Sequence, residues 1–257
     1  MPVEHEVYAK APLVLVTTQL RYAHEPRLNS AEVRDVAAEE LRSILPVLDI
    51  ESVEDEAGEV TRHLRATNEQ RSISVVISSQ ALTIDATEYT HFGEFSELLG
   101  VCLSALEVAV GKLYVERVGL RYIDEVRPPG ITLTQDWDKW IAPELVSAVK
   151  LLPNRAPDRL HGSTFYEVAD RTFLVFQWGE VVGQSVVAPS EVRNTLPEPG
   201  RFFVLDADAF WVPESPTAAA PTAILERFGE LHSPVSETFQ ASLTEQAREM
   251  FRGDTSE

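Results

Sequence analysis

The pattern L-R-Y-x-x-E occupies residues 20–25 and recurs at residues 120–125, one hundred positions further along the chain. Each copy ends an apolar run rich in branched residues, and these runs predict β-strands at residues 12–22 and 113–123. A repeat of this length indicates an internal duplication, in which one structural unit occurs twice. The repeat therefore predicts the architecture before any functional motif is considered.

The elements that follow each repeat also correspond. In the first unit a helix is predicted from Asn29 or Ser30 to Pro46, because Asn and Ser cap helices and proline ends them. A hairpin, a strand and a long apolar helix follow, at residues 61–78, 81–87 and 92–110. In the second unit the same order of helix, hairpin, strand and helix is predicted at residues 143–152, 164–178, 202–208 and 223–251.

The predicted order is β-α-β-β-β-α, twice, with about eight mainly antiparallel strands and with helices packed on one face of the sheet. We therefore expect an α+β fold. Residues 1–112 form the first repeat, and residues 113–257 form the second, which has extra loops and a long C-terminal helical region. The repeats are expected to pack tightly as a pseudo-dimer, either as two domains or as one. The Ser233-Pro234 step is expected to break or kink the last helix.

The composition limits the class of protein. With 257 residues, of which 44% are hydrophobic, the chain is long enough for one large core or two smaller ones. Its formal charge of −19, from 41 acidic and 22 basic residues, disfavours nucleic acid and anionic membranes, which bind through lysine and arginine. We expect a basic or neutral protein partner instead.

Cysteine usage and the chain ends favour the cytoplasm. Cys102 is the single cysteine, which excludes an internal disulfide and suits a reducing compartment. Its position in the apolar stripe of the helix at 92–110 predicts a buried, inert thiol. The N-terminal residues lack a basic leader, and no segment approaches the ~20 apolar residues of a membrane span. We therefore expect a soluble cytoplasmic protein.

Alternation along the strands places charged residues on the more polar face of the sheet. Arg21 and Arg121 point away from the apolar side of their strands, as do Asp85 and Asp206 in theirs. We predict two equivalent ion pairs, Arg21 with Asp85 and Arg121 with Asp206. Such pairs more often specify packing than perform chemistry. The alternative is that the arginines stay free and hold an anionic ligand bidentately.

Motifs for catalysis are sparse. The sequence has no Walker-type loop, no G-x-G-x-x-G and no nucleophile elbow, and its six histidines are scattered. We predict no cofactor, no metal and no catalytic residue, although the pair Asp206 and Asp208, or the acids at 124–125, leave acid–base chemistry open. Trp178 and Trp211 are candidates for lining a pocket or a partner surface, while core packing is the commoner role of such residues.

Three short motifs are similar to those of a known family. They are Y-x-x-x-P-L at residues 8–13, G-L-R-Y-I-D at residues 119–124 and F-x-x-x-L-T at residues 239–244. Over nearly its whole length the chain resembles a sporadically distributed family of bacterial and phage proteins of unknown function, in which Asn commonly stands where this chain has Asp124. The resemblance implies no catalytic residues. The patchy distribution of that family implies mobile or defence-related genes.

These observations favour a non-enzymatic binding protein of the antitoxin or immunity-protein kind, whose acidic surface binds a protein partner. The alternative is a small-ligand binding or sensing protein with a pocket between a curved sheet and its helices. An enzyme that uses the Arg and Asp residues of the polar face is a third hypothesis. The candidate binding residues are Arg21, Arg121, Asp85, Asp206, Trp178 and Trp211.

Overall fold

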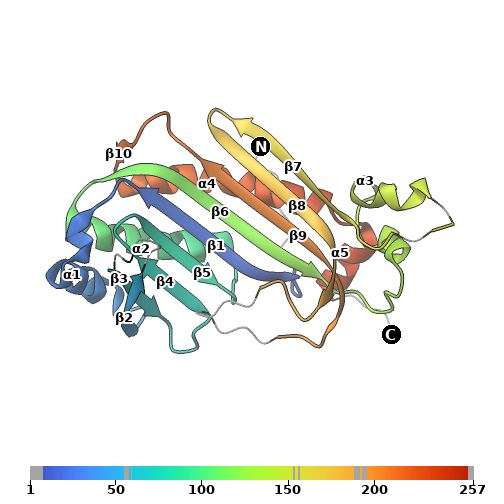
Figure 1. Cartoon of the computed structure of the whole chain (residues 1–257), viewed down its shortest axis with the longest axis horizontal. Helices are drawn as coiled ribbons and strands as arrows, with labels where there is room; N and C mark the ends of the chain where they lie inside the picture. The colour runs from blue at the N-terminus through green and yellow to red at the C-terminus, as the bar shows by residue number, and fades with distance from the viewer. Residues whose placement is uncertain are drawn as a thin grey trace.

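A computed structural model describes residues 8–54, 58, 60–152, 154–155, 157–187, 192 and 196–253. Its strands form one ten-stranded sheet in the order β2-β3-β4-β5-β1-β6-β9-β8-β7, with the short β10 paired to β6 (Figure 1). Each pair of neighbouring strands is antiparallel, as the predicted hairpins require. The α+β class expected from the sequence is confirmed.

Each unit contributes one half of the sheet. The elements of the first unit are β1 (Leu13–Tyr22), η1 (Pro26–Asn29), α1 (Ala31–Leu41), β2 (Val47–Glu54), β3 (Val60–Thr67), β4 (Ile73–Ile77), β5 (Ala81–Ala86) and α2 (Phe92–Val110). Those of the second unit are β6 (Leu113–Val126), η2 (Thr134–Lys139), α3 (Pro143–Val146), η3 (Ser147–Leu151), β7 (His161–Ala169), β8 (Thr172–Gly183), β9 (Gly200–Trp211), β10 (Thr217–Ala219), α4 (Pro221–Ala241) and α5 (Glu245–Arg252).

The duplication is visible in the order of the strands. The first unit is arranged as β3-β4-β5-β1, and the second is arranged in the same way as β7-β8-β9-β6. The first strands of the two units, β1 and β6, pair with each other at the centre of the sheet. In this pairing Gln19 lies opposite Gly119, so equivalent positions of the two repeats face each other. The sheet therefore has an approximate two-fold axis through this pair.

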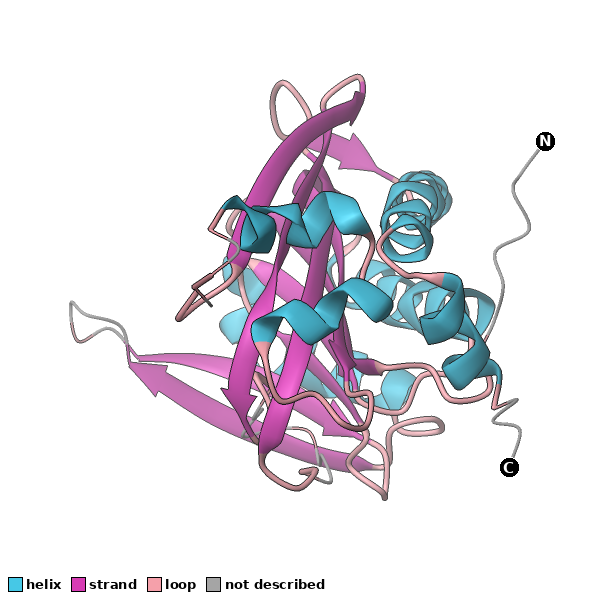
Figure 2. Cartoon of the chain, turned by 90° about the vertical axis from the view of Figure 1, so that its right-hand side faces the viewer, coloured by secondary structure: helices cyan, strands magenta, loops and turns pink. Residues whose placement is uncertain are grey.

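The core lies between the sheet and the two long helices. Figure 1 shows α2 and α4 behind the central strands, and Figure 2 shows helices to the right of the sheet, with short helical segments in front of it. The apolar stripe of α2 is buried as its spacing predicts, at Phe95, Leu99, Cys102, Leu103, Leu106 and Val110. Burial raises the pKa of the Cys102 thiol to about 12, so the thiol stays protonated and unreactive at neutral pH.

The opposite face of the central strands is not covered by these helices. Along β1 the side chains of Val16, Thr18 and Leu20 are buried, whereas Thr17 and Gln19 are partly exposed. We call the side that carries Thr17 and Gln19 the open face. The alternation that was read from the sequence therefore assigns the two faces correctly.

The structure differs from the sequence prediction at four elements. Strands β2 and β10 were not predicted; β2 is an edge strand, largely exposed, whose acidic residues obscure the strand pattern. The helix expected at 143–152 is divided into α3 and η3. Helix α4 continues through Pro234, so the break that was one of the two expectations is absent, and the alternative of a kink stays a prediction. A proline inside a helix costs about 3 kcal/mol, but Leu231 and Val235 on either side of it are fully buried, and their burial offsets that cost.

No helix among the residues that the structure describes has the length and apolar character needed to cross a membrane.

Candidate functional site

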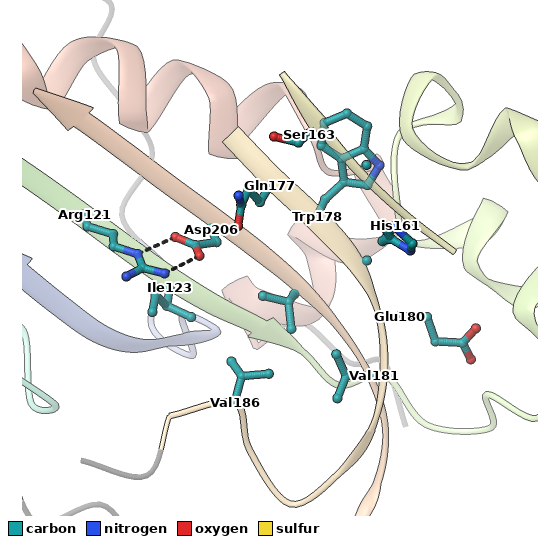
Figure 3. A pocket seen from close by; sticks show the side chains of 13 residues that line it. Arg121, Ile123, His161, Ser163, Gln177, Trp178, Glu180, Val181, Val186 and Asp206 are labelled. Carbon is teal, nitrogen blue, oxygen red and sulfur yellow. Dashed lines mark hydrogen bonds and ion pairs between the residues drawn. The ribbon is translucent and has the colours of Figure 1, made fainter. Parts of the chain in front are cut away.

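A shallow groove of about 670 Å³ lies on the open face of the second unit. Residues of β6, β7, β8 and β9 line it, and its outer wall includes Val186 of the segment after β8 (Figure 3). Three of the residues predicted as binding residues meet here: Arg121, Asp206 and Trp178. The groove is therefore the candidate site that the sequence and the structure share.

Arg121 and Asp206 form the predicted ion pair at the floor of the groove. The guanidinium donates from Nε to Oδ1 at 2.7 Å and from Nη2 to Oδ2 at 2.6 Å, a bidentate arrangement (Figure 3). The carboxylate raises the pKa of Arg121 through these hydrogen bonds. The side chain of Asp206 is only 13% exposed. Its two hydrogen bonds with Arg121 use the guanidinium edge that an anionic ligand would need.

A second ion pair lies beside the first. Nη2 of Arg117 donates to both carboxylate oxygens of Asp208, at 3.0 and 3.1 Å. Burial raises the pKa of Asp208 and outweighs the opposing effect of the two nearby arginines. The Arg117 guanidinium also lies 4.6 Å from the centre of the Phe210 ring and fills the space above Gly119, where a Cβ atom would come within 2.2 Å of it.

The far wall of the groove combines polar and aromatic groups. His161 and Gln177 are exposed, and Trp178 is half-buried. The Trp178 ring stacks on Phe176 with the ring centres 5.3 Å apart, and its Nε1 donates to the Leu145 carbonyl at 3.2 Å. Trp178 is thus held in place by packing on one side while it contributes to the groove on the other.

Glu180 lies in the same wall of the groove and has two interaction partners. Its side chain is 4% exposed, forms an ion pair with Arg201, and accepts a hydrogen bond of 2.7 Å from Thr134 Oγ1. A carboxylate in this position is held by two partners. It connects β8 with β9 through Arg201 and with η2 through Thr134.

The predicted ion pair of Arg21 with Asp85 is wrong, because the two residues are not opposite each other in the pairing of β1 with β5. Arg21 is opposite Ala81, four positions from Asp85 along β5, and Asp85 is opposite Thr17, whose Oγ1 donates to it at 2.7 Å. In the second unit, Arg121 is opposite Asp208. The residue equivalent to Asp208 is therefore Ala81, and the expected match of Asp85 with Asp206 was out of register by six positions.

Trp211 also lies outside the groove. It ends β9, and the Arg227 guanidinium of α4 lies 5.2 Å from the centre of its ring. This contact with α4 places the ring on the helix side of the sheet. Trp211 packs there, as large aromatic residues commonly do, and it does not line the groove to which Trp178 contributes.

The sequence reasoning undervalued Asp124, which was considered only as one of two adjacent acids. Asp124 is 5% exposed and lines a separate cavity on the helix side of the sheet. Burial raises the pKa of its carboxyl well above the usual value, and the charge of Asp206 raises it further. The signal was present in the sequence, since Leu120, Tyr122 and Asp124 alternate onto the same face of β6.

The groove combines paired charges with exposed polar groups. Within the described part of the chain, no group of three or more His, Cys, Asp or Glu side chains is placed to hold a metal ion. Asp206 and Asp208, which left acid–base chemistry open, each accept hydrogen bonds from an arginine. The groove therefore offers fixed charges, exposed amide and imidazole groups and apolar walls to a ligand.

Comparison with protein-family models and with curated proteins gives no match for this chain. The resemblance suggested by the three short motifs therefore stays a prediction.

Proposed function

We propose that the protein is a non-enzymatic binding protein whose open face receives a protein partner, in the manner of an antitoxin or immunity protein. One observation carries this proposal: a row of aromatic side chains crosses the uncovered face beside the groove. Phe165, Phe173 and Phe210 follow one another across β7, β8 and β9: Phe165 stacks on Phe173 with ring centres 5.4 Å apart, and Phe173 lies tilted against Phe210 at 5.6 Å. The row ends at Phe165, which is 63% exposed on the edge strand.

An aromatic row that is exposed at Phe165 and partly buried at Phe173 and Phe210, with ion pairs beside it, has the composition of a protein interface. Aromatic anchors supply most of the binding free energy in such interfaces, while surrounding polar groups set the register. The net charge of −19 selects a basic partner and accelerates its association. The two paired arginines support docking more than catalysis, because their guanidinium groups are already neutralised by Asp206 and Asp208.

The test uses a photo-crosslinking amino acid in place of Phe165, in protein expressed in its native cytosol. We expect one dominant crosslinked adduct that weakens at high salt, because the attraction between the charges is screened. The matched control carries the same amino acid in place of Val108, which is 61% exposed on α2, on the helix side. Equal adducts from both positions, or none from position 165, would contradict the proposal.

A second function is favoured by a different observation. A cavity of about 340 Å³ lies between the sheet and helices α2 and α4, where a pocket for a small ligand was anticipated. Pockets of roughly 300–1,000 Å³ accommodate small organic ligands. We propose ligand binding in this cavity as the second candidate function.

A further inference from the structure

The cavity on the helix side brings together segments from distant parts of the chain. Tyr8 and Leu13 come from the N-terminal segment and β1, Tyr122 and Asp124 come from β6, and Phe239 comes from α4. All three motifs singled out in the sequence therefore contribute to one cavity. None of these residues takes part in the groove of the open face.

One acidic group in this cavity is buried without a partner. Asp124 is 5% exposed, and across the described residues its carboxyl has no hydrogen bond and no ion pair with another residue. Burying a carboxylate that lacks a partner is costly, and a protein normally offsets that cost with a donor or a cation. A ligand that brings a donor would remove this penalty.

The remaining walls are mainly aromatic. Tyr89 and Tyr122 meet edge to face with ring centres 5.5 Å apart, and their hydroxyl groups are 2.6 Å apart. Phe92 stacks on His232 at 4.2 Å. Aromatic ring faces attract organic cations, and the attraction is strongest where water is excluded. The walls therefore favour a cation with an apolar body over a hydrated metal ion.

The polar groups of the cavity also favour an organic cation as the ligand. The hydroxyl of Tyr8 donates to Gln240 Oε1 at 2.8 Å, so both groups already have a partner. Burial raises the pKa of Tyr89 to about 12 and also raises that of Tyr122, so neither phenol becomes anionic at neutral pH. Asp124 is the one carboxylic acid among the described residues that line the cavity, and a bound cation would favour its ionised form, because an opposite charge nearby lowers the pKa of a carboxyl group. An anionic ligand would disfavour that form.

We propose that this cavity binds a small organic cation, an aromatic or aliphatic primary amine, with Asp124 as the anchor for its ammonium group. The inference rests on the second candidate function and specifies the ligand class. The ammonium would donate to the Asp124 carboxylate, and the apolar body would lie among Tyr89, Phe92 and Phe239. The net charge of −19 would concentrate such cations near the protein.

Three probes with the same aromatic body test the ligand class: phenethylamine, 2-phenylethanol and phenylacetate, each titrated calorimetrically into the full chain. We expect the amine to bind at least about tenfold more tightly than the alcohol, because only the amine forms a charge-assisted hydrogen bond with Asp124. Phenylacetate should not bind. If the alcohol or the acid binds as well as the amine, the cation class is refuted while ligand binding stands.

Two variants locate the site. Asp124→Asn keeps the shape of the side chain and should reduce the affinity for phenethylamine to that for 2-phenylethanol, without changing the affinity for the alcohol. Ser236→Leu places an apolar side chain into the cavity from α4 and should abolish binding of both probes. Unchanged amine binding in Asp124→Asn would overturn the proposed anchor. Absence of binding by all three probes would refute both the ligand class and the second candidate function.

Discussion

The two units of the sheet share their buried face and differ on their open face. In both units the Leu and Tyr of the L-R-Y repeat are buried against the helices. The second unit has the longer strands beside the central pair, with twelve residues in each of β8 and β9, against five in β4 and six in β5. Its larger open face carries the groove and the aromatic row.

The difference follows from what constrains each face. A residue on the buried face must fit the helices packed on it, so both units need similar apolar side chains there. The open face has no such requirement, and Arg121 gained a bidentate carboxylate partner while Arg21 lies opposite Ala81. Specialised binding features can therefore arise in one unit without disturbing the common core.

The shared core should respond alike in both units. Leu20→Ala and Leu120→Ala each remove a fully buried side chain from the central strands. We expect each to lower the free energy of unfolding by about 2–5 kcal/mol. Urea unfolding followed by circular dichroism measures the effect. A large loss in one variant with almost none in the other would show that the two cores are not equivalent.

The buried acid of β6 should make stability depend on pH. The pKa of Asp124 is higher in the folded than in the unfolded protein, so the folded state binds more protons and loses stability as pH rises above about 4. The loss should approach about 1.4 kcal/mol per pH unit until the raised pKa is passed. The other titratable side chains that line the cavity of Asp124 include Tyr89, Tyr122 and His232.

Asp124→Asn removes this titration, so its stability should exceed that of the wild type by an amount that grows between pH 4.5 and 7. Thermal unfolding over this pH range provides the comparison. Asp35→Asn, an exposed acid on α1, serves as the matched control and should leave the pH profile unchanged. A constant difference between Asp124→Asn and the wild type would show that the carboxyl is not strained by burial.

The smallest effect concerns the two arginines of the repeat. Arg121→Ala leaves Asp206 partly buried without its bidentate partner, and since Arg121 is 46% exposed we expect a loss of about 1 kcal/mol. Arg21→Ala should change stability by less than about 0.5 kcal/mol, as exposed substitutions usually do. An unchanged melting temperature for Arg121→Ala would count against a structural role for the pair.

Local patterns predicted most of the fold. The strand alternation assigned the two faces correctly, and the helical spacing identified the stripe around Cys102. The charged edge strand β2 was missed, because its acidic residues hide the alternation that a half-buried strand shows. Helix α4 was expected to break or kink at Pro234, but it continues without a break, with fully buried residues on both sides of the proline. Tertiary packing overrode the local signal in that case.

Part of the groove was also predictable. The pair of Arg121 with Asp206 was anticipated from strand faces alone, but the pair of Arg21 with Asp85 was not formed. The sequence analysis treated Asp85 and Asp206 as equivalent, which is an error of six positions in the alignment of the two strands. A shift by an even number of residues leaves each side chain on the same face of the sheet. The pattern of inward and outward residues therefore could not reveal that Asp85 and Asp206 are not equivalent.

The sequence by itself determined the repeated unit, the α+β class and the buried side of each central strand. These properties follow from local periodicity, which each segment carries independently of its neighbours. Only the tertiary structure decided the register between the strands and the meeting of Tyr8, Asp124 and Phe239 in one cavity. Contacts between segments more than one hundred residues apart depend on how the strands pair and the helices pack, and no local pattern encodes that arrangement.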